Sequence, residues 1–154
     1  MRKTKDYETI KVVSLKMVKE NSVKYISSGE QITTKNQILN IVRPILEDSA
    51  IERIIMIGVD TQNKPSVIHI QNGSVNRCAI YPQTLFKILL LSNCASFFIV
   101  HNHPSGSLIP SESDWEVTES LKDAAKLFDI TFIDHLIVNA DLTKCTEMRS
   151  FARW

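Results

Sequence analysis

The sequence predicts an α/β fold in which a mixed β-sheet is flanked by helices. Apolar runs rich in β-branched and aromatic residues alternate along the chain with segments whose apolar residues recur at three- and four-residue steps. The chain has 154 residues, of which 44% are hydrophobic and 23% charged, and these values are typical of a globular domain with a buried core. No repeat or low-complexity segment interrupts the pattern. We therefore expect a single domain over residues 1–154.

The first part of the chain predicts a strand, a helix and two further strands. Apolar residues supply the faces of a strand over Ile10–Val18. A helix over Lys35–Glu47 has an apolar stripe made of Ile38, Ile41, Val42 and Ile45. Apolar runs at 53–60 and 66–71 predict two strands, joined by a turn over Asp60–Lys64.

The second part alternates two helices with two strands. Pro82, after Tyr81, marks the start of a helix over 82–92. An apolar run predicts a strand near 95–101, and apolar residues at helical steps predict a helix over 111–128. A strand over 131–138 completes the alternation.

Two histidines stand at the end of the strand near 95–101. Side chains at i and i+2 share a face of a strand, so His101 and His103 can point at one ion while Asn102 faces away. A zinc ion that does chemistry takes three protein ligands from His, Asp or Glu and leaves its fourth position to water. The pair therefore predicts a metal site that needs a further ligand.

Ser111 and Asp114 allow two interpretations. The prolines and the glycine in residues 104–110 disfavour a helix there, so Asp114 lies in the first turn of the helix that follows. One interpretation is an ordinary helix start, with Ser111 as the N-cap and an acid favoured by the helix dipole. The other makes Asp114 the third metal ligand. The joint pattern of His-x-His followed by Ser-x-x-Asp favours the metal site.

Better-known motifs are missing from the chain. The sequence contains no His-Glu-x-x-His helix, no zinc-deaminase signature, no P-loop, no Rossmann fingerprint and no Gly-x-Ser-x-Gly elbow. The contiguous His-Asn-His tripeptide is not the dispersed residue set that gives HNH nucleases their name. A (β/α)₈ barrel needs roughly 250 residues, far more than this chain has.

With these residues in place, the chain resembles the JAMM (MPN+) metalloproteases, and most closely their RadC-like branch. The hexapeptide His101–Gly106 is the characteristic string of that branch. The resemblance runs from about Ile51 to about Ile137 and includes the Asp60–Lys64 turn, Tyr81-Pro82 and Asp134-His135-Leu136-Ile137. It implies an MPN-type fold, with residues 51–137 as the motif core.

The resemblance also implies roles for individual residues. His101, His103 and Asp114 match the family's zinc ligands, and Ser111 matches the serine that hydrogen-bonds at the metal site and to the oxyanion. Glu52 falls where the family has its acid/base glutamate. Zinc can lower the pKa of a bound water from 15.7 to about 7, so this set would hydrolyse an amide bond.

The roles of Glu52 and of the Asp134-His135 pair leave alternatives open. Glu47 and Asp48 are rivals of Glu52, which could also be a solvated charge at a strand start. Asp134 and His135 match an Asp-His pair of the family. Either could orient a metal ligand, or one of the pair could be only a buried hydrogen-bonded group.

Two departures from the family pattern concern the ends of the chain. Residues 139–145 replace a glycine-rich turn, which puts in doubt any substrate groove that this edge lines. We expect no helix-hairpin-helix module of the kind that longer members of the family carry. Residues 1–30 instead form a basic region around the predicted first strand.

Charge and cysteine content limit the binding partners and the cellular compartment that we expect. The formal net charge of +1 gives no global attraction to nucleic acid, and no aromatic residues interleave the basic residues of the N-terminal region. No apolar run is long enough for a membrane span, and Cys78, Cys94 and Cys145 fit reduced thiols. We expect a cytoplasmic protein.

Two classes of function remain open at this point. The first is a zinc-dependent peptidase or isopeptidase that acts on a peptide or a modified protein. The second is a metal-binding module of the same fold that acts by binding, for example to DNA or to a replication or repair complex. Because every predicted ligand is present, the first class is favoured.

Overall fold

The computed structural model describes residues 14, 18, 20–22, 24, 31–47, 49, 51–73 and 80–154. The strand predicted over Ile10–Val18 lies outside the described residues except for Ser14 and Val18. Asp48 and Cys78 also lie outside them.

Five strands form one mixed sheet in the order β2-β1-β3-β4-β5. Their bounds are β1 Arg53–Val59, β2 Pro65–Asn72, β3 Ser96–Asn102, β4 Thr131–Val138 and β5 Cys145–Glu147. The central pair β3 and β4 is parallel, and the other neighbours are antiparallel. The predicted α/β fold with a mixed sheet is confirmed.

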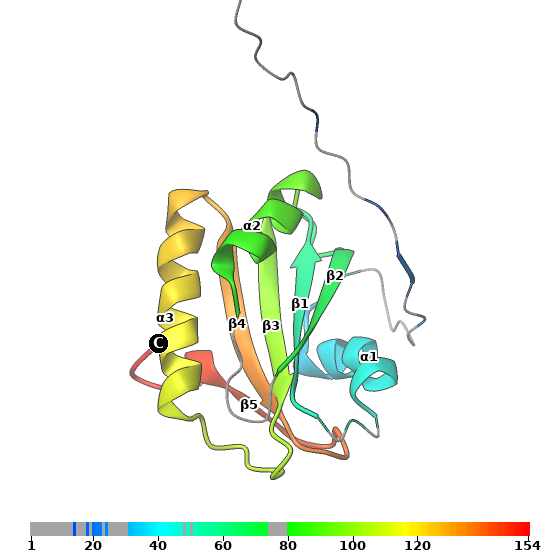
Figure 1. Cartoon of the computed structure of the whole chain (residues 1–154), viewed down its shortest axis with the longest axis vertical. Helices are drawn as coiled ribbons and strands as arrows, with labels where there is room; N and C mark the ends of the chain where they lie inside the picture. The colour runs from blue at the N-terminus through cyan, green and yellow to red at the C-terminus, as the bar shows by residue number, and fades with distance from the viewer. Residues whose placement is uncertain are drawn as a thin grey trace, which may run out of the picture.

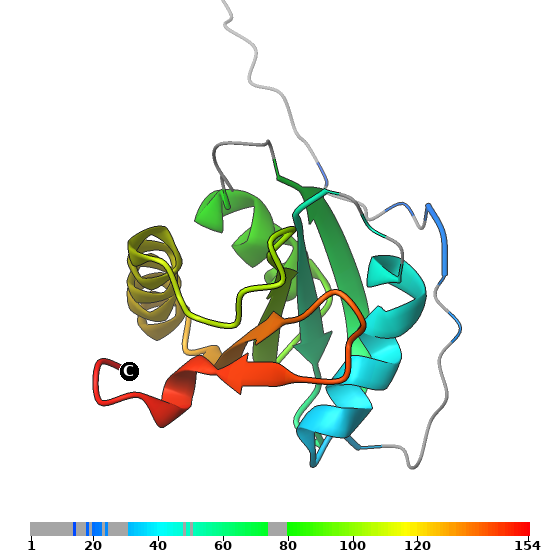
Figure 2. The same ribbon diagram turned by 90° about the horizontal axis from the view of Figure 1, so that it is seen from below.

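Helices cover both faces of the sheet. Helix α1 (Lys35–Leu46) lies on one face, and helices α2 (Pro82–Leu91) and α3 (Glu112–Leu127) lie on the other (Figures 1 and 2). All three were predicted, with ends that differ by a residue or so. Within the part of the chain that the structure describes, no helix has the length and apolar character needed to cross a bilayer.

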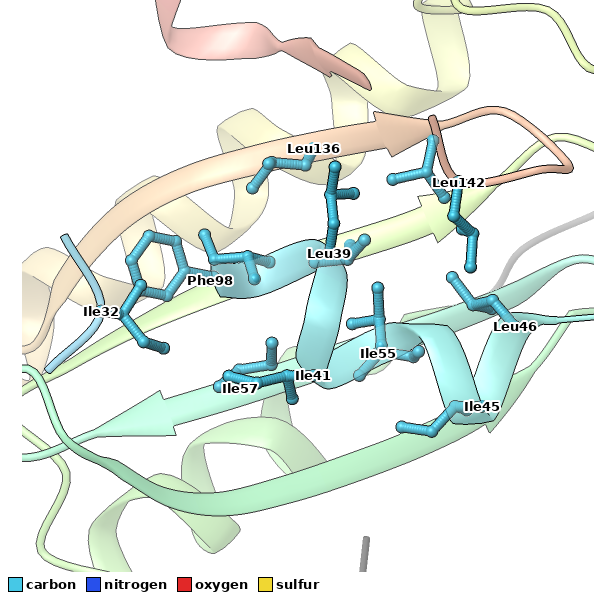
Figure 3. Packing of buried hydrophobic residues seen from close by; sticks show 14 of the residues in the cluster. Ile32, Leu39, Ile41, Ile45, Leu46, Ile55, Ile57, Phe98, Leu136 and Leu142 are labelled. Carbon is cyan, nitrogen blue, oxygen red and sulfur yellow. The ribbon is translucent and has the colours of Figure 1, made fainter. Parts of the chain in front are cut away.

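The α1 face of the sheet holds one apolar core. The stripe predicted for α1 is buried, and Ile41 and Val42 are almost completely inaccessible. These side chains pack over strand residues that point to this face, among them Ile55, Ile57 and Phe98 (Figure 3). Burial of each such side chain stabilises the fold by about 1.5–3 kcal/mol.

The α2/α3 face holds a second core, in which β1 approaches α2 very closely. Phe97 and Ile99 of β3 point to this face. A Cβ atom added to Gly58 of β1 would lie 2.6 Å from the Sγ atom of Cys94 and 3.0 Å from a methyl group of Leu89. Glycine at this position is therefore what allows the helix to pack so near the strand.

An irregularity in β4 decides which of its side chains face α3. Phe132 pairs with Phe97, but the next pair is Asp134 with Phe98, so Ile133 is an extra residue. Such a bulge changes the face to which the following residues point. As a result, His135 lies beside Ile99 of β3, on the α2/α3 face.

The C-terminal segment forms β5 and a short 3₁₀ helix (Met148–Ser150), neither of which was predicted. The turn before β5 is made without glycine. Leu142 takes a positive φ of 56°, and the Asn139 side chain accepts a hydrogen bond from the Lys144 amide (2.9 Å). Side-chain hydrogen bonds therefore stabilise this turn in the absence of glycine, and the edge strand β5 still forms.

Candidate metal centre

The end of β3 brings two imidazoles together on the α2/α3 face. The Nε2 atoms of His101 and His103 lie 2.8 Å apart. His101 is buried, whereas His103 is partly exposed, so the site opens to solvent on the side of His103. The Nδ1 atom of His103 lies 2.9 Å from the main-chain oxygen of Ser107 and donates to it, because a carbonyl oxygen can only accept. This leaves the Nε2 lone pair of a neutral His103 directed into the site.

The first turn of α3 delivers the third group. Ser111 is the N-cap of α3, and its hydroxyl oxygen accepts a hydrogen bond from the Asp114 amide (3.2 Å). In return the Asp114 Oδ2 atom accepts from the Ser111 amide and hydroxyl, both at 2.7 Å. The helix-start interpretation is confirmed, and it is compatible with the metal-ligand interpretation, because the capping box itself aims the carboxylate toward the histidines.

The carboxylate of Asp114 faces both histidines. Its Oδ1 atom lies 3.2 Å from the Nε2 atom of His101, and its Oδ2 atom lies 3.3 Å from the Nε2 atom of His103. Each of the three residues offers one ligand atom, and these three atoms lie within 4.8 Å of one another. Three lone-pair donors from two imidazoles and a carboxylate fit a divalent metal ion, and this donor set is one that catalytic zinc uses.

The electrostatics of the site keep the carboxylate ionised. Burial alone would raise the pKa of Asp114, but the imidazoles of His101 and His103 that face its carboxylate, and the hydrogen bond from the Ser111 hydroxyl, hold that pKa well below its usual range. The hydrogen bond to Asp114 raises the pKa of His103, although burial works against this. The cluster thus attracts positive charge, whether a proton or a metal ion.

Glu52 stands at the rim of this site. Ile54 of β1 lies opposite His101 in the antiparallel register, so continuing that register by two residues places Glu52 opposite His103. Residues two apart share a face, and Ile54 packs in the core on the α2/α3 face. The negative charge of Glu52 contributes to the raised pKa of His103. Its rival Glu47 caps the end of α1, the helix on the opposite face of the sheet.

Asn102 holds the backbone on both sides of Glu52. Its Oδ1 atom accepts from the Arg53 amide (2.9 Å), and its Nδ2 atom donates to the Ile51 carbonyl (3.1 Å). The residue is 4% exposed. It turns away from the imidazoles, as expected, but its positioning of the acidic residue was not predicted, because only the strand register shows that Glu52 and Asn102 are neighbours.

His135, rather than Asp134, reaches the histidine pair. The Nε2 atom of His135 lies 2.7 Å from the Nδ1 atom of His101, and its own Nδ1 atom lies 2.7 Å from the Oγ1 atom of Thr118. Burial lowers the pKa of His135 well below its usual value, so the ring is neutral. Thr118 was not predicted, and its only sequence signal is its place one helical turn after Asp114.

Asp134 serves the C-terminal segment instead. Its Oδ1 atom accepts from the amides of His135 (2.8 Å) and Arg149 (3.1 Å), and its Oδ2 atom lies 3.3 Å from the Arg149 Nε atom. Burial raises the pKa of Asp134 to about 6, although these hydrogen bonds oppose the shift. Of the Asp-His pair, the structure thus brings one member to the site and places the other as a buried hydrogen-bonded group.

The chain is similar in sequence to a known family and to proteins of two organisms. The model of a family described as the RadC-like JAB domain matches residues 32–153. A UPF0758 protein of Paraburkholderia phytofirmans is 30% identical over 142 residues, which cover 90% of this chain and 52% of that protein. A UPF0758 protein of Methanosarcina mazei is 35% identical over 111 residues, which cover 70% of this chain and 48% of that protein. The chain therefore spans about half the length of these relatives.

Proposed function

This chain belongs to the RadC-like JAB domain family, and we propose that it is a zinc-dependent peptidase or isopeptidase that hydrolyses an amide bond. The observation that carries the proposal is the convergence of His101, His103 and Asp114 at a site that opens beside Glu52. The JAB family membership is consistent with this chemistry. The relatives' name states no activity, so the proposal rests on the site.

The three converging residues would hold the metal ion. The Nε2 atoms of His101 and His103 and the carboxylate of Asp114 would be its ligands. When bound, zinc would lower the pKa of a water molecule to about 7 and polarise the carbonyl group of the substrate. His101 is buried, so solvent is excluded on its side of the site. His103 is partly exposed, so a peptide would reach the site from that side.

Glu52 would move the proton. Its carboxylate would accept a proton from the attacking water and return it to the leaving amine, a role that typically contributes 10²–10⁴-fold to the rate. The backbone that carries it is held by Asn102 and by the Gly73 amide, which donates to the Glu52 carbonyl (2.8 Å). A general base needs this fixed position, because proton transfer depends on hydrogen-bonding distance.

Ser111 would stabilise the developing charge. Its hydroxyl donates to the Oδ2 atom of Asp114 in this structure, and its amide donates to the same atom. If the hydroxyl turns to the carbonyl oxygen of a substrate, the hydrogen bond from the Ser111 amide to Asp114 remains. Removal of one such donor from an oxyanion site typically costs about 10²–10³-fold in rate.

The test is a peptide-library cleavage assay read by mass spectrometry, with a second panel of peptides that carry isopeptide-linked lysines. Zinc-loaded wild-type protein is compared with the same protein after chelation and with Glu52→Gln. We expect cleavage by the wild type alone, with zinc retained by Glu52→Gln. Full activity in Glu52→Gln would show that Glu52 is not the base, and cleavage that survives chelation would contradict the metal mechanism.

A further inference from the structure

A hydrogen-bonded chain of three buried side chains lies behind the proposed metal ligands. It leads from the Nδ1 atom of His101 to His135 (2.7 Å), from His135 to the hydroxyl of Thr118 (2.7 Å), and from that hydroxyl to the main-chain oxygen of Asp114 (2.7 Å). His101, His135 and Thr118 are each 1% exposed. Water therefore cannot replace any member of the chain, and each hydrogen bond must be satisfied from within.

The hydroxyl of Thr118 fixes the direction of these hydrogen bonds. The Thr118 hydroxyl lies 2.7 Å from the main-chain oxygen of Asp114, which can only accept, and 3.7 Å from the weaker acceptor, the sulfur of Met148, so its single proton points to Asp114. The Thr118 oxygen is then free to accept from the Nδ1 atom of His135, which must carry a proton. His135 is 1% exposed and its two ring nitrogens face a hydroxyl and an imidazole, not an anion, so a charged ring there would be costly. A neutral ring with its proton on Nδ1 has none left for Nε2, so this atom accepts from the Nδ1–H of His101.

We propose that Thr118 and His135 are positioning residues that fix His101 in the tautomer with its proton on Nδ1. The Nε2 lone pair of His101 then always faces His103 and Asp114, as a ligand requires. The assignment of the tautomer follows from the hydrogen bonds and from the burial of His135, and only its purpose, metal binding, rests on the proposed function.

The chain also joins two of the proposed ligands to each other. It starts at a ring atom of His101 and ends at the main chain of Asp114, whose carboxylate faces the other side of the same imidazole. Strand β3 and the first turn of α3 are thus linked by a closed circuit of contacts. These contacts fix the separation of the two proposed ligands in the absence of a metal ion.

Removal of the Thr118 hydroxyl should reverse the tautomers. In Thr118→Val, the Nδ1–H of His135 would have no acceptor, and the buried ring would instead place its proton on Nε2. That proton would point at the Nδ1 atom of His101, which would have to accept, so the proton of His101 would move to Nε2 and block the ligand position. Loss of such a supporting group typically lowers metal affinity about 10–100-fold.

Two measurements on the full chain test this proposal. Nitrogen-15 NMR of the imidazoles in metal-free protein reports which ring nitrogen carries each proton. Competition with a chromophoric chelator gives the zinc affinity. We expect Nδ1 protonated and Nε2 unprotonated in His135 of the wild type. Zinc affinity should fall about 10–100-fold in Thr118→Val and return close to the wild-type value in Thr118→Ser.

A matched control is Thr143→Val, because Thr143 also donates its hydroxyl proton to an oxygen, that of Asp141, but on an exposed turn. This variant should keep the wild-type affinity. A proton on Nε2 of His135 in the wild type would overturn the proposal, as would a Thr118→Val protein with unchanged affinity. If Thr118→Val does not fold, the proton positions of His135 in the wild-type spectrum and the zinc affinity of Thr118→Ser still test the proposal. The expected tautomers in a protein that binds no zinc would refute the proposed function but leave the tautomer assignment standing.

Discussion

Asn102 offers the sharpest prediction about how the site is supported. Asn102→Ala removes the acceptor for the Arg53 amide (2.9 Å) and the donor to the Ile51 carbonyl (3.1 Å). An unsatisfied buried group costs about 1–3 kcal/mol, and the Ile51 carbonyl, on an exposed residue, adds less. We therefore expect the free energy of unfolding to fall by about 2–4 kcal/mol.

The assay is urea unfolding of metal-free protein, followed by tryptophan fluorescence. Asn139→Ala is the matched control, because Asn139 also makes two side-chain hydrogen bonds, with Lys144 and Thr143, but near the surface. Water can replace those bonds, so this variant should lose less than about 1 kcal/mol. Equal losses in the two variants would refute the role assigned to Asn102.

The same variant separates support of Glu52 from metal binding. Asn102 contacts the backbone beside Glu52 and does not contact the ligand atoms of His101 or His103. Asn102→Ala should therefore retain zinc affinity in the folded protein while hydrolysis falls. Loss of zinc at temperatures where the variant is folded would contradict this division of roles.

Three further predictions concern Gly58, Ser111 and Asp134. Gly58→Ala should cost about 1–3 kcal/mol by overpacking against Cys94, and Gly58→Ala combined with Cys94→Ala should recover part of that loss in urea unfolding. Ser111→Ala should cost about 1 kcal/mol as a lost N-cap, and a zinc competition assay should show weaker binding because Asp114 loses a hydrogen bond. Asp134 has a pKa of about 6 in the folded protein against 3.8 unfolded, so the folded state binds more protons between these values. The wild type should therefore lose up to about 3 kcal/mol of stability as pH rises through this interval. Thermal melts of Asp134→Asn over the same interval should lack that slope.

The elements with strong local patterns could be predicted from the sequence. The stripe of α1 and the β-branched runs of β1 and β3 carry their periodicity within a few residues. His101 and His103 could be placed on one face for the same reason, since strand alternation is local. β5 spans three residues and follows a turn with Leu142 in a positive-φ conformation, so neither a pattern nor a glycine marks it.

The parts that could not be predicted depend on register between distant segments. The sequence did not distinguish His135 from Asp134, because the extra residue Ile133 decides which of them faces α3. The contact between Thr118 and His135 likewise depends on how α3 lies over β4. Asn102 and Glu52 are neighbours only through the pairing of β1 with β3.

The metal content of the purified protein tests the central claim most directly. Atomic spectrometry on protein prepared without chelators should find about one zinc ion per chain, the number that a single three-ligand site can hold. The ion should be lost in both His101→Ala and Asp114→Ala. His69→Ala should retain it, because His69 lies on β2 and is not one of the three converging residues. A wild-type protein without zinc, or zinc that persists in both ligand variants, would contradict the account.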